Sequence, residues 1–266
     1  MSTAQINGLN LYYERAGAGP PLLFISGTGG DLRNKPNQFD GSLPRSFDMV
    51  SYDQRGLGRS DKPDVAYSMA DYADDAAALM DRLGWADAHV IGVSFGGMVA
   101  QELVLRHPRR VRRLVLACTS PGGAGGSSFP FHEIEHLKGV ARARYMIPIS
   151  DTRRDESWAA AHPDQYEKLV ELASADPYAD EPGHAAGAHR QLEARAGHDT
   201  WDRLPDIGCP VLIAAGRHDG IAPLAIQERL AARIPGARLQ VFEGGHLFMI
   251  QDRTATPAMA AFLLGG

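Results

Sequence analysis

The segment 92–96, Gly-Val-Ser-Phe-Gly, constrains the fold more strongly than any other part of the sequence. An apolar run at 89–91 precedes it, and a helix-like run at 97–105 follows it. Glycine lacks a Cβ atom, so the two glycines allow a tight turn between a strand and a helix. Such a turn presents the Ser94 hydroxyl beside a helix N-terminus, where free N–H groups favour negative charge. The pattern therefore predicts a nucleophile elbow with Ser94 at its tip.

Strand-like and helix-like segments alternate along most of the chain. The segments expected as strands are 4–6, 9–14, 22–25, 49–52, 89–91, 114–118, 211–215 and 239–242, and those expected as helices are 68–83, 97–105, 225–233 and 256–264. Asn7-Gly8 between the first two strands predicts a hairpin turn. Most of the strands are short and continuously apolar, which is typical of a parallel sheet covered by helices on both faces. We therefore predict an α/β fold with a mostly parallel, twisted sheet.

A change in composition interrupts this alternation. The segment 121–128 is rich in Gly, Pro and Ser and predicts a break in regular structure. Residues from about 129 to 200 carry helical patterns but no clear strand. We therefore predict a core formed by residues 1–120 and 203–266, with a small helical cap, residues 121–202, inserted after the sixth strand.

The overall composition limits the classes of partner. Hydrophobic residues make up 44% of the chain and charged residues 22%, as in ordinary globular proteins. A net charge of -5 without a basic block argues against nucleic acid, and no apolar run is long enough to span a membrane. The first five residues lack signal-peptide features, and Cys118 and Cys209 show no spacing motif. We therefore expect a cytoplasmic protein, and the sequence leaves a homo-oligomer open.

A serine nucleophile needs a general base and an acid that orients the base. His246 follows the strand 239–242 in a loop with two glycines, and Asp219 follows the strand 211–215. In a parallel α/β sheet, functional sites gather at the carboxyl ends of the strands, where the elbow also lies. His246 is thus the predicted base and Asp219 the predicted acid. His218 is a second candidate base, but neighbouring residues in an extended loop point apart, which favours His246.

The order Ser94, Asp219, His246 is that of the α/β-hydrolases. The sequence resembles this superfamily over essentially its whole length. The matching segments are 52–61 (Tyr-Asp-Gln-Arg-Gly-Leu-Gly-Arg-Ser-Asp), the elbow, 210–223 and 243–251. The resemblance implies that Ser94 is the nucleophile, His246 the general base and then acid, and Asp219 the orienting carboxylate. The inserted cap resembles that of small esterases, enol-lactonases and carbon–carbon bond hydrolases.

The same resemblance implies an oxyanion hole, which requires two N–H donors. The amide of Phe95, at the start of the elbow helix, is the first expected donor. The family takes the second donor from the loop after the third strand, here 26–30, and by position this donor is Thr28. Many relatives carry His-Gly in this loop, whereas this chain has Ser26-Gly27, which resembles the loop of the enol-lactonase type.

Substrate contacts are expected from the surroundings of the elbow and from the cap. The residues expected to line the site are Gly27, Met98, Leu247, Tyr145 and Trp158. The candidates for binding a substrate carboxylate are Arg142, Arg144, Arg190 and Arg195, although a solvated position is the simpler expectation for each one.

The segment 132–136 matches the zinc motif H-E-x-x-H, in which a helix places both histidines on one face. Pro130 and Gly139 leave room for only about two helical turns, and no third ligand follows at a recognisable spacing. A solvated helix face in the cap is therefore the preferred interpretation.

A charged cluster follows the strand 49–52 and consists of Asp53, Arg55, Ser60 and Asp61. Such a cluster is more often a network of ion pairs and turn hydrogen bonds than a catalytic site, and a structural role is the preferred interpretation.

Together, these observations predict a serine hydrolase that cleaves a small-molecule carboxylic ester or lactone through an acyl-enzyme, with no cofactor and no metal ion. Three alternatives stay open. They are a carbon–carbon bond hydrolase of the meta-cleavage type on the same scaffold, a non-catalytic α/β-hydrolase that binds a ligand, and a zinc enzyme that uses the segment 132–136.

Overall fold

The computed structural model describes residues 2–266; Met1, with which the predicted first core segment begins, lies outside the described residues. Eight strands form one sheet in the order β1-β2-β4-β3-β5-β6-β7-β8. The strands are β1 (Ser2–Ile6), β2 (Leu9–Ala16), β3 (Pro21–Ile25), β4 (Asp48–Tyr52), β5 (Ala88–Val93), β6 (Val111–Ala117), β7 (Val211–Gly216) and β8 (Arg238–Phe242). β2 pairs antiparallel with β1 and with β4, and all the other pairs are parallel. The predicted mostly parallel sheet is therefore confirmed.

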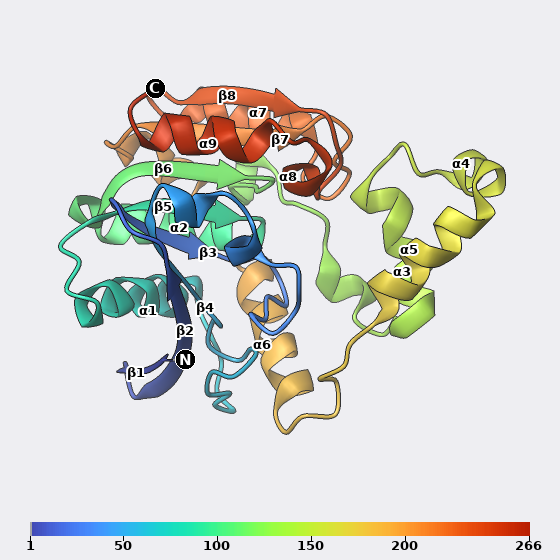
Figure 1. Cartoon of the computed structure of the whole chain (residues 1–266), viewed down its shortest axis with the longest axis horizontal. Helices are drawn as coiled ribbons and strands as arrows, with labels where there is room; N and C mark the ends of the chain where they lie inside the picture. Colours follow the sequence, from blue (N-terminus) through green and yellow to red (C-terminus); the bar gives the residue numbers. More distant parts are fainter. Residues whose placement is uncertain (1) are drawn as a thin grey trace.

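The inner strands bury side chains on both faces of the sheet. In β3, Leu23 and Ile25 join a core with α1 (Met69–Arg82), α2 (Phe95–Arg106) and α7 (Leu224–Arg233). Leu22 and Phe24 face the opposite side and join a second core with α8 (Phe248–Gln251) and α9 (Ala255–Leu263). Figure 1 shows helices on both sides of the sheet. Burial on two faces explains why these strands are continuously apolar in sequence.

Local signals fix the ends of several elements. Asn7 and Gly8 have φ values of 50° and 80°, as the predicted two-residue hairpin turn requires. Ser68 caps α1, because its side chain accepts a hydrogen bond from the Asp71 amide while the Asp71 carboxylate accepts one from the Ser68 amide. The helices predicted at 225–233 and 256–264 are α7 and α9, each of which begins one residue earlier than predicted.

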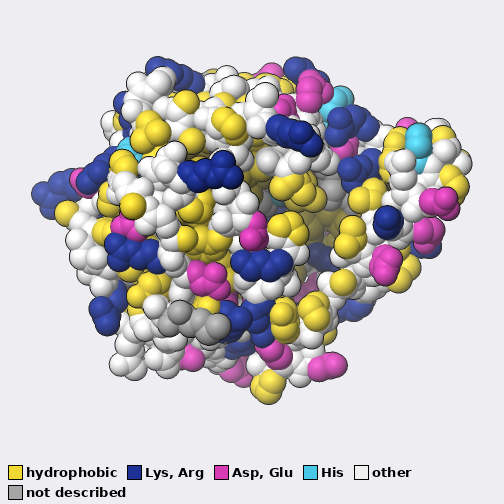
Figure 2. Space-filling model, in the orientation of Figure 1, with side chains coloured by type: hydrophobic (Ala, Val, Ile, Leu, Met, Phe, Trp, Pro, Cys, Tyr) yellow, Lys and Arg dark blue, Asp and Glu magenta, His cyan; other side chains and the backbone are white. Residues whose placement is uncertain are grey.

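The helices between β6 and β7 form the cap. They are α3 (Gly139–Ser150), α4 (Glu156–Ala161), α5 (Pro163–Ser174) and α6 (His184–Ala196). In Figure 1, α3, α4 and α5 stand away from the sheet. α6 packs against the core, where a Cβ atom on Gly187 would lie only 1.9 Å from the Gly56 carbonyl oxygen, so this close approach requires glycine. Figure 2 shows a hollow between the outer cap helices and the core, with hydrophobic side chains on its walls.

The chain enters and leaves the cap at one place. Gly122 and Asp199 form an isolated antiparallel bridge. Beside it, the Thr200 amide donates a hydrogen bond of 2.9 Å to the Pro121 carbonyl. The strands that flank the cap, β6 and β7, are neighbours in the sheet. We call residues 121–122 and 199–200 the neck of the cap.

Within residues 2–266, no helix combines the length and the apolar character that crossing a membrane requires.

Candidate active site

Ser94 lies in a strained turn between β5 and α2. Its φ of 54° and ψ of -116° fall where residues other than glycine are rarely found. A Cβ atom on Gly92 would lie 2.7 Å from the Ala100 Cβ, and one on Gly96 would overlap the Ile25 carbonyl oxygen. Only glycine therefore fits at these two positions. The chain makes the tight strand–turn–helix geometry that the glycine spacing predicted.

Ser94, His246 and Asp219 form one hydrogen-bonded chain. The Ser94 Oγ lies 3.0 Å from His246 Nε2, and His246 Nδ1 lies 2.9 Å from Asp219 Oδ2. The second carboxylate oxygen of Asp219 accepts hydrogen bonds from the amides of Ile221 and Ala222 at 2.8 and 2.9 Å. Asp219 is buried, and this fixed carboxylate favours the imidazole tautomer with its proton on Nδ1. His246 Nε2 is then free to accept the proton of Ser94.

The end of α3 holds the loops that carry Asp219 and His246. The carbonyl of Ser150 accepts a hydrogen bond of 2.7 Å from the His246 amide. The carbonyl of Ile149 accepts one of 3.0 Å from the amide of Gly220, directly after Asp219. The cap thus contributes backbone acceptors to both loops.

The loop 26–30 passes next to Ser94. A Cβ atom on Gly27 would lie 3.3 Å from the Ser94 Cβ and 3.9 Å from its Oγ. Phe95 is the first residue of α2, so its N–H has no acceptor within the helix. Throughout residues 2–266, no hydrogen-bond acceptor is found for the amide of Thr28 or for that of Phe95. Both N–H groups are therefore available to a ligand.

Leu247, Met98 and Tyr145 were expected to contact the substrate, and the structure places them in different surroundings. Leu247 directly follows the histidine in sequence and is 54% exposed. Met98 is buried one turn along α2, and its amide donates a hydrogen bond of 3.3 Å to the Ser94 carbonyl. Tyr145 is 47% exposed and packs its ring against Phe129. Leu247 and Tyr145 are therefore accessible, whereas Met98 belongs to the core.

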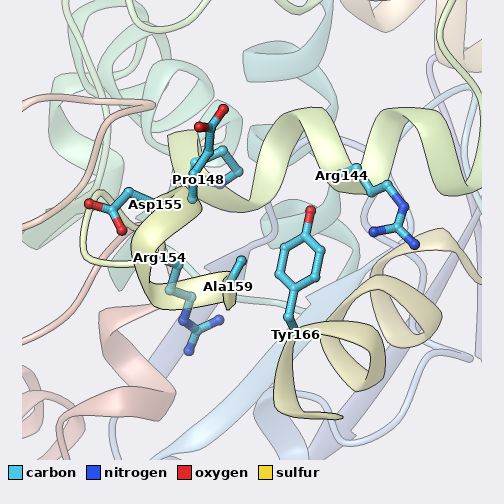
Figure 3. A pocket seen from close by; sticks show the side chains of 7 residues that line it. Arg144, Pro148, Arg154, Asp155, Ala159 and Tyr166 are labelled. Carbon is cyan, nitrogen blue, oxygen red and sulfur yellow. The ribbon is translucent and has the colours of Figure 1, made fainter. Parts of the chain in front are cut away.

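Trp158 departs from the expectation that it lines the site. It lies on α4, which Figure 1 shows at the end of the cap farthest from α2, and it stacks on His162 with ring centroids 5.0 Å apart. The outer cap helices enclose a cavity of about 300 Å³ whose walls include Pro148, Ala159 and Tyr166 (Figure 3). Trp158 therefore packs within the cap, because α4 is held against α5 rather than over the sheet.

The alternative histidine assignments lack the required geometry. His218 lies 3.5 Å from the Glu243 carboxylate and not in the hydrogen-bonded chain with Ser94. The segment 132–136 does not form an α-helix. The regular structure there is a short 3₁₀ helix, Phe131–Ile134. The helix face expected at this segment is thus corrected to a short 3₁₀ turn. Within residues 2–266, the potential metal-ligating groups of three or more side chains do not include His132 or His136.

The charged cluster after β4 stabilises turns and an ion pair. The Asp53 carboxylate accepts hydrogen bonds from the amides of Leu32 and Arg59 at 2.7 and 2.9 Å, and burial raises the pKa of Asp53 to about 6. Arg55 donates two hydrogen bonds, of 2.7 and 2.8 Å, to Asp75. Ser60 and Asp61 accept hydrogen bonds from the backbone amides of Tyr12 and Asn10. These contacts agree with the structural role that the sequence suggested.

Comparison with known proteins identifies the family. A family model described as "alpha/beta hydrolase fold" matches residues 20–252. The chain belongs to the α/β-hydrolase family. This α/β-hydrolase is 32% identical over 244 residues to "Putative carbamate hydrolase RutD" of Azorhizobium caulinodans, an alignment that covers 90% of this chain and 89% of the relative.

Two solved structures share the fold over nearly their whole length. An enol-lactonase from Burkholderia xenovorans LB400 has a TM-score of 0.80 and 26% identity, with all of both chains covered. A single-substitution mutant of CumD, a meta-cleavage product hydrolase, has a TM-score of 0.76 and 25% identity, with 99% of this chain and 97% of that chain covered. The helical cap between β6 and β7 is therefore part of a shared architecture.

Two residues near the centre of this α/β-hydrolase were not predicted. Gln191 on α6 accepts a hydrogen bond of 2.8 Å from the amide of Gly29, and so connects the cap to the loop 26–30. Cys118 has a φ of 41°, and its sulfur lies within 4.8 Å of ring and carboxylate atoms of His246 and Asp219. Burial raises the pKa of this thiol well above its usual value. Neither residue belongs to a motif, so no spacing signal marked them.

Proposed function

We propose that this α/β-hydrolase is a serine hydrolase that cleaves a small-molecule carboxylic ester or lactone through an acyl-enzyme on Ser94. The observation that carries the proposal is the continuous chain of hydrogen bonds from Ser94 Oγ through the His246 ring to the buried Asp219 carboxylate. A hydroxyl at neutral pH is a weak nucleophile, and this arrangement supplies the base and its orienting group within direct reach.

The roles of the side chains follow from their positions. The Ser94 Oγ attacks the substrate carbonyl while His246 Nε2 takes its proton, and Asp219 stabilises the resulting imidazolium. The amides of Phe95 and Thr28 donate hydrogen bonds to the oxygen that becomes negatively charged. His246 then protonates the leaving alcohol. A water molecule, deprotonated by the same histidine, attacks the acyl group and releases the acid from Ser94.

The relatives support acyl transfer to water as the reaction class. The enol-lactonase is named for its action on a cyclic ester. In this chain the loop 26–30 carries Ser26-Gly27 in place of His-Gly, which resembles the loop of the enol-lactonase type. The RutD relative is named for a carbamate, which is also attacked at an acyl carbon. These likenesses favour an ester or lactone without selecting one compound.

Active-site labelling tests the proposal. A fluorophosphonate probe should modify one serine, and peptide mapping should identify it as Ser94. Ser94→Ala should lower kcat on short-chain activated esters by about a thousandfold or more while leaving the thermal unfolding temperature near that of the native protein. Ser174→Ala, at the exposed end of α5, is the matched control and should retain activity. Near-normal turnover by Ser94→Ala would refute the assignment.

A carbon–carbon bond hydrolase is the second candidate, favoured by the likeness to CumD. Both reactions use the same serine and histidine, so labelling alone does not separate them. A paired assay with short-chain esters and vinylogous diketones does. Turnover of the diketones without turnover of esters would select the second candidate, and a labelled but inactive protein on both panels would indicate a ligand-binding role.

A further inference from the structure

A small cavity of about 60 Å³ lies under the end of α6, beside the elbow helix. Its inner wall includes Met98, Ser120, Arg195 and His198, and the exposed His132 lies at its rim. The hydrogen bond from the Met98 amide to the Ser94 carbonyl places this wall one helical turn from the serine. The cavity is therefore next to the candidate active site and distinct from the larger cavity within the cap.

Arg195 is a buried cation without a carboxylate partner. The residue is only 6% exposed, and within residues 2–266 no Asp or Glu is paired with it. Its guanidinium lies 4.6 Å from the centre of the Phe131 ring, a contact that supplies no formal negative charge. Its guanidinium donates hydrogen bonds to the Phe129 carbonyl at 2.7 Å and to the Ser128 Oγ at 2.6 Å, while its Nε has no acceptor. Burial lowers its pKa to about 10, so the group remains charged at neutral pH. A buried charge without a counter-charge is unfavourable, and a water molecule cannot supply that charge.

The other arginines that were candidates for binding a carboxylate are in different situations. Arg144 is paired with Glu167 and Arg190 with Glu193, both at 2.9 Å. Arg142 lies over the Phe131 ring, as Arg195 does, but it is only partly buried and does not line the small cavity. Among the four, Arg195 alone combines burial, an unpaired charge and a cavity.

His198 adds a second unsatisfied group to the same wall. It is 5% exposed, and within residues 2–266 neither ring nitrogen makes a hydrogen bond of good geometry, although the Ser120 backbone lies near the ring. Burial lowers its pKa to about 4, with smaller opposing contributions from Glu102, the Ser120 backbone and Asp199. The ring is thus neutral at pH 7 and has one N–H to donate. A buried donor without a well-formed hydrogen bond is costly, which favours an additional acceptor in the cavity.

We propose that this cavity is a binding subsite for a carboxylate group, held by the Arg195 guanidinium and the His198 ring. The wall of the cavity lacks a negative charge, and a carboxylate supplies one. Its oxygens can also accept hydrogen bonds from the Arg195 Nε–H and from an imidazole N–H of His198. The cavity has room for little more than the carboxylate itself, so the rest of the ligand extends past the rim at His132. Two sources fit this chemistry: a carboxylate carried by the substrate, and a free short-chain carboxylate.

The substrate source rests on the proposed function, but binding of a carboxylate does not. The first experiment therefore uses Ser94→Ala protein, which keeps the cavity and does not turn over. Calorimetric titration with sodium acetate, compared with sodium chloride at equal ionic strength, should show saturable binding of acetate. In protein with isotope-labelled histidines, the His198 ring resonances should shift along the same titration.

Paired arginine variants test which cation is responsible. In the Ser94→Ala background, Arg195→Gln should weaken acetate binding about tenfold to a hundredfold. Arg190→Gln removes the same charge from the same helix and should change acetate binding by less than about twofold, since that arginine is partly exposed and already paired with Glu193 and Asp64. Arg195→Lys restores the charge and should recover part of the affinity. Thermal unfolding of each variant verifies that the fold is kept.

A substrate pair separates the two sources. If the carboxylate belongs to the substrate, the wild-type enzyme should prefer mono-p-nitrophenyl glutarate to p-nitrophenyl butyrate, and Arg195→Gln should abolish the preference through a higher KM. If it is a free carboxylate, acetate should bind without such a preference and should change the rate on the neutral ester. Absence of acetate binding together with an unmoved His198 signal would overturn the proposal, as would equal affinities of the Arg195→Gln and Arg190→Gln proteins.

Discussion

Ser94 keeps a backbone conformation that costs free energy, and the residues around it explain why the conformation persists. Its amide donates a hydrogen bond of 2.8 Å to the Ala117 carbonyl, and its own carbonyl accepts one of 2.8 Å from the Thr119 hydroxyl. Such strain survives only where the surroundings over-determine it, and it is concentrated at functional sites. Gly92 and Gly96 are glycines because a side chain at either position would collide with neighbouring atoms of the turn.

The crowding around Gly96 leads to a stability prediction. Gly96→Ala places a methyl group against the backbone of Ile25, so we expect it to lower the free energy of unfolding by about 2 kcal/mol or more. Gly208→Ala is the control, because a Cβ atom there meets nothing within 4 Å. Urea unfolding of both variants measures the difference. A Gly96→Ala protein as stable as Gly208→Ala would contradict the packing described for the elbow.

The carboxylate of Asp219 leads to a catalytic prediction. Asp219→Asn keeps the oxygen that accepts from the amides of Ile221 and Ala222, but an amide NH₂ facing His246 Nδ1 favours the tautomer protonated on Nε2. Such a ring cannot take the serine proton. We expect kcat to fall about a thousandfold or more with little change in unfolding temperature. Asp155→Asn, at the exposed start of α4, should leave kcat unaltered; comparable losses in both variants would argue against an orienting role.

Single residues differ in how far the sequence could predict them. Ser94, Asp219 and His246 were predictable because each follows an apolar strand, and the ends of parallel strands share one edge. Arg195 and His198 were not, because their role depends on burial beside a cavity, which spacing along the chain does not encode. Trp158 was misplaced for a related reason, since aromatic character shows a preference for burial but not which neighbour provides it.

At the scale of elements, the cap is joined to the functional loops by specific hydrogen bonds. The end of α3 holds the loops of the acid and the histidine, and α6 holds the loop 26–30 through the Gln191–Gly29 hydrogen bond. Gln191 is fully buried, and its Nε2 has no acceptor within residues 2–266. The position of α6 therefore determines where this loop presents its N–H groups.

The Gln191 contact gives a prediction for the cap. Gln191→Leu keeps the approximate size of the side chain but removes the acceptor for Gly29. The loop should then hold its N–H groups less firmly, lowering kcat about tenfold with a smaller change in KM. His189→Gln, on the exposed face of the same helix, is the control. A pure increase in KM in Gln191→Leu would instead indicate that Gln191 only binds substrate.

The type of an element was easier to predict than its local geometry. The alternation of apolar strands and helices predicted the sheet and both helical layers, because a buried parallel sheet requires strands that are apolar on both faces. The strand order was not encoded in any single segment, since it depends on pairing between distant strands. The segment 132–136 lies between Pro130 and the start of α3 at Gly139, and its regular structure is limited to the 3₁₀ helix Phe131–Ile134, although its pattern of residues fits a longer helix equally well.

For the whole molecule, the buried His198 predicts how stability depends on pH. Its pKa is about 4 when folded, against 6.5 for an exposed histidine, so the unfolded chain binds the proton more readily. The contribution of neutral His198 to the free energy of unfolding is fully present above about pH 6.5. It decreases as the pH falls toward 4, by about 3 kcal/mol in total. Asp53, whose pKa is raised to about 6, acts in the opposite sense over part of this range.

A variant isolates this contribution. The free energy of unfolding of His198→Gln, taken relative to that of the wild-type protein, should therefore rise by about 3 kcal/mol as the pH falls from 6.5 to 4, because the contribution of Asp53 is the same in both proteins and cancels in the difference. The free energy of unfolding is measured by urea titration in a buffer without carboxylates, because a bound anion would favour the protonated ring. Parallel pH curves for the two proteins would show that His198 is not the group responsible.

The neck gives the architecture a consequence for its evolution. Because the chain leaves β6 and returns to β7 at one place, the residues between 122 and 199 are joined to the rest of the chain through a single pair of adjacent backbone segments. Recombination at these two points would exchange the cap without altering the pairing of any strand. New specificities can therefore arise by exchanging the segment between these two points, provided that the incoming segment restores the backbone acceptors of Ile149 and Ser150 and the side-chain acceptor of Gln191.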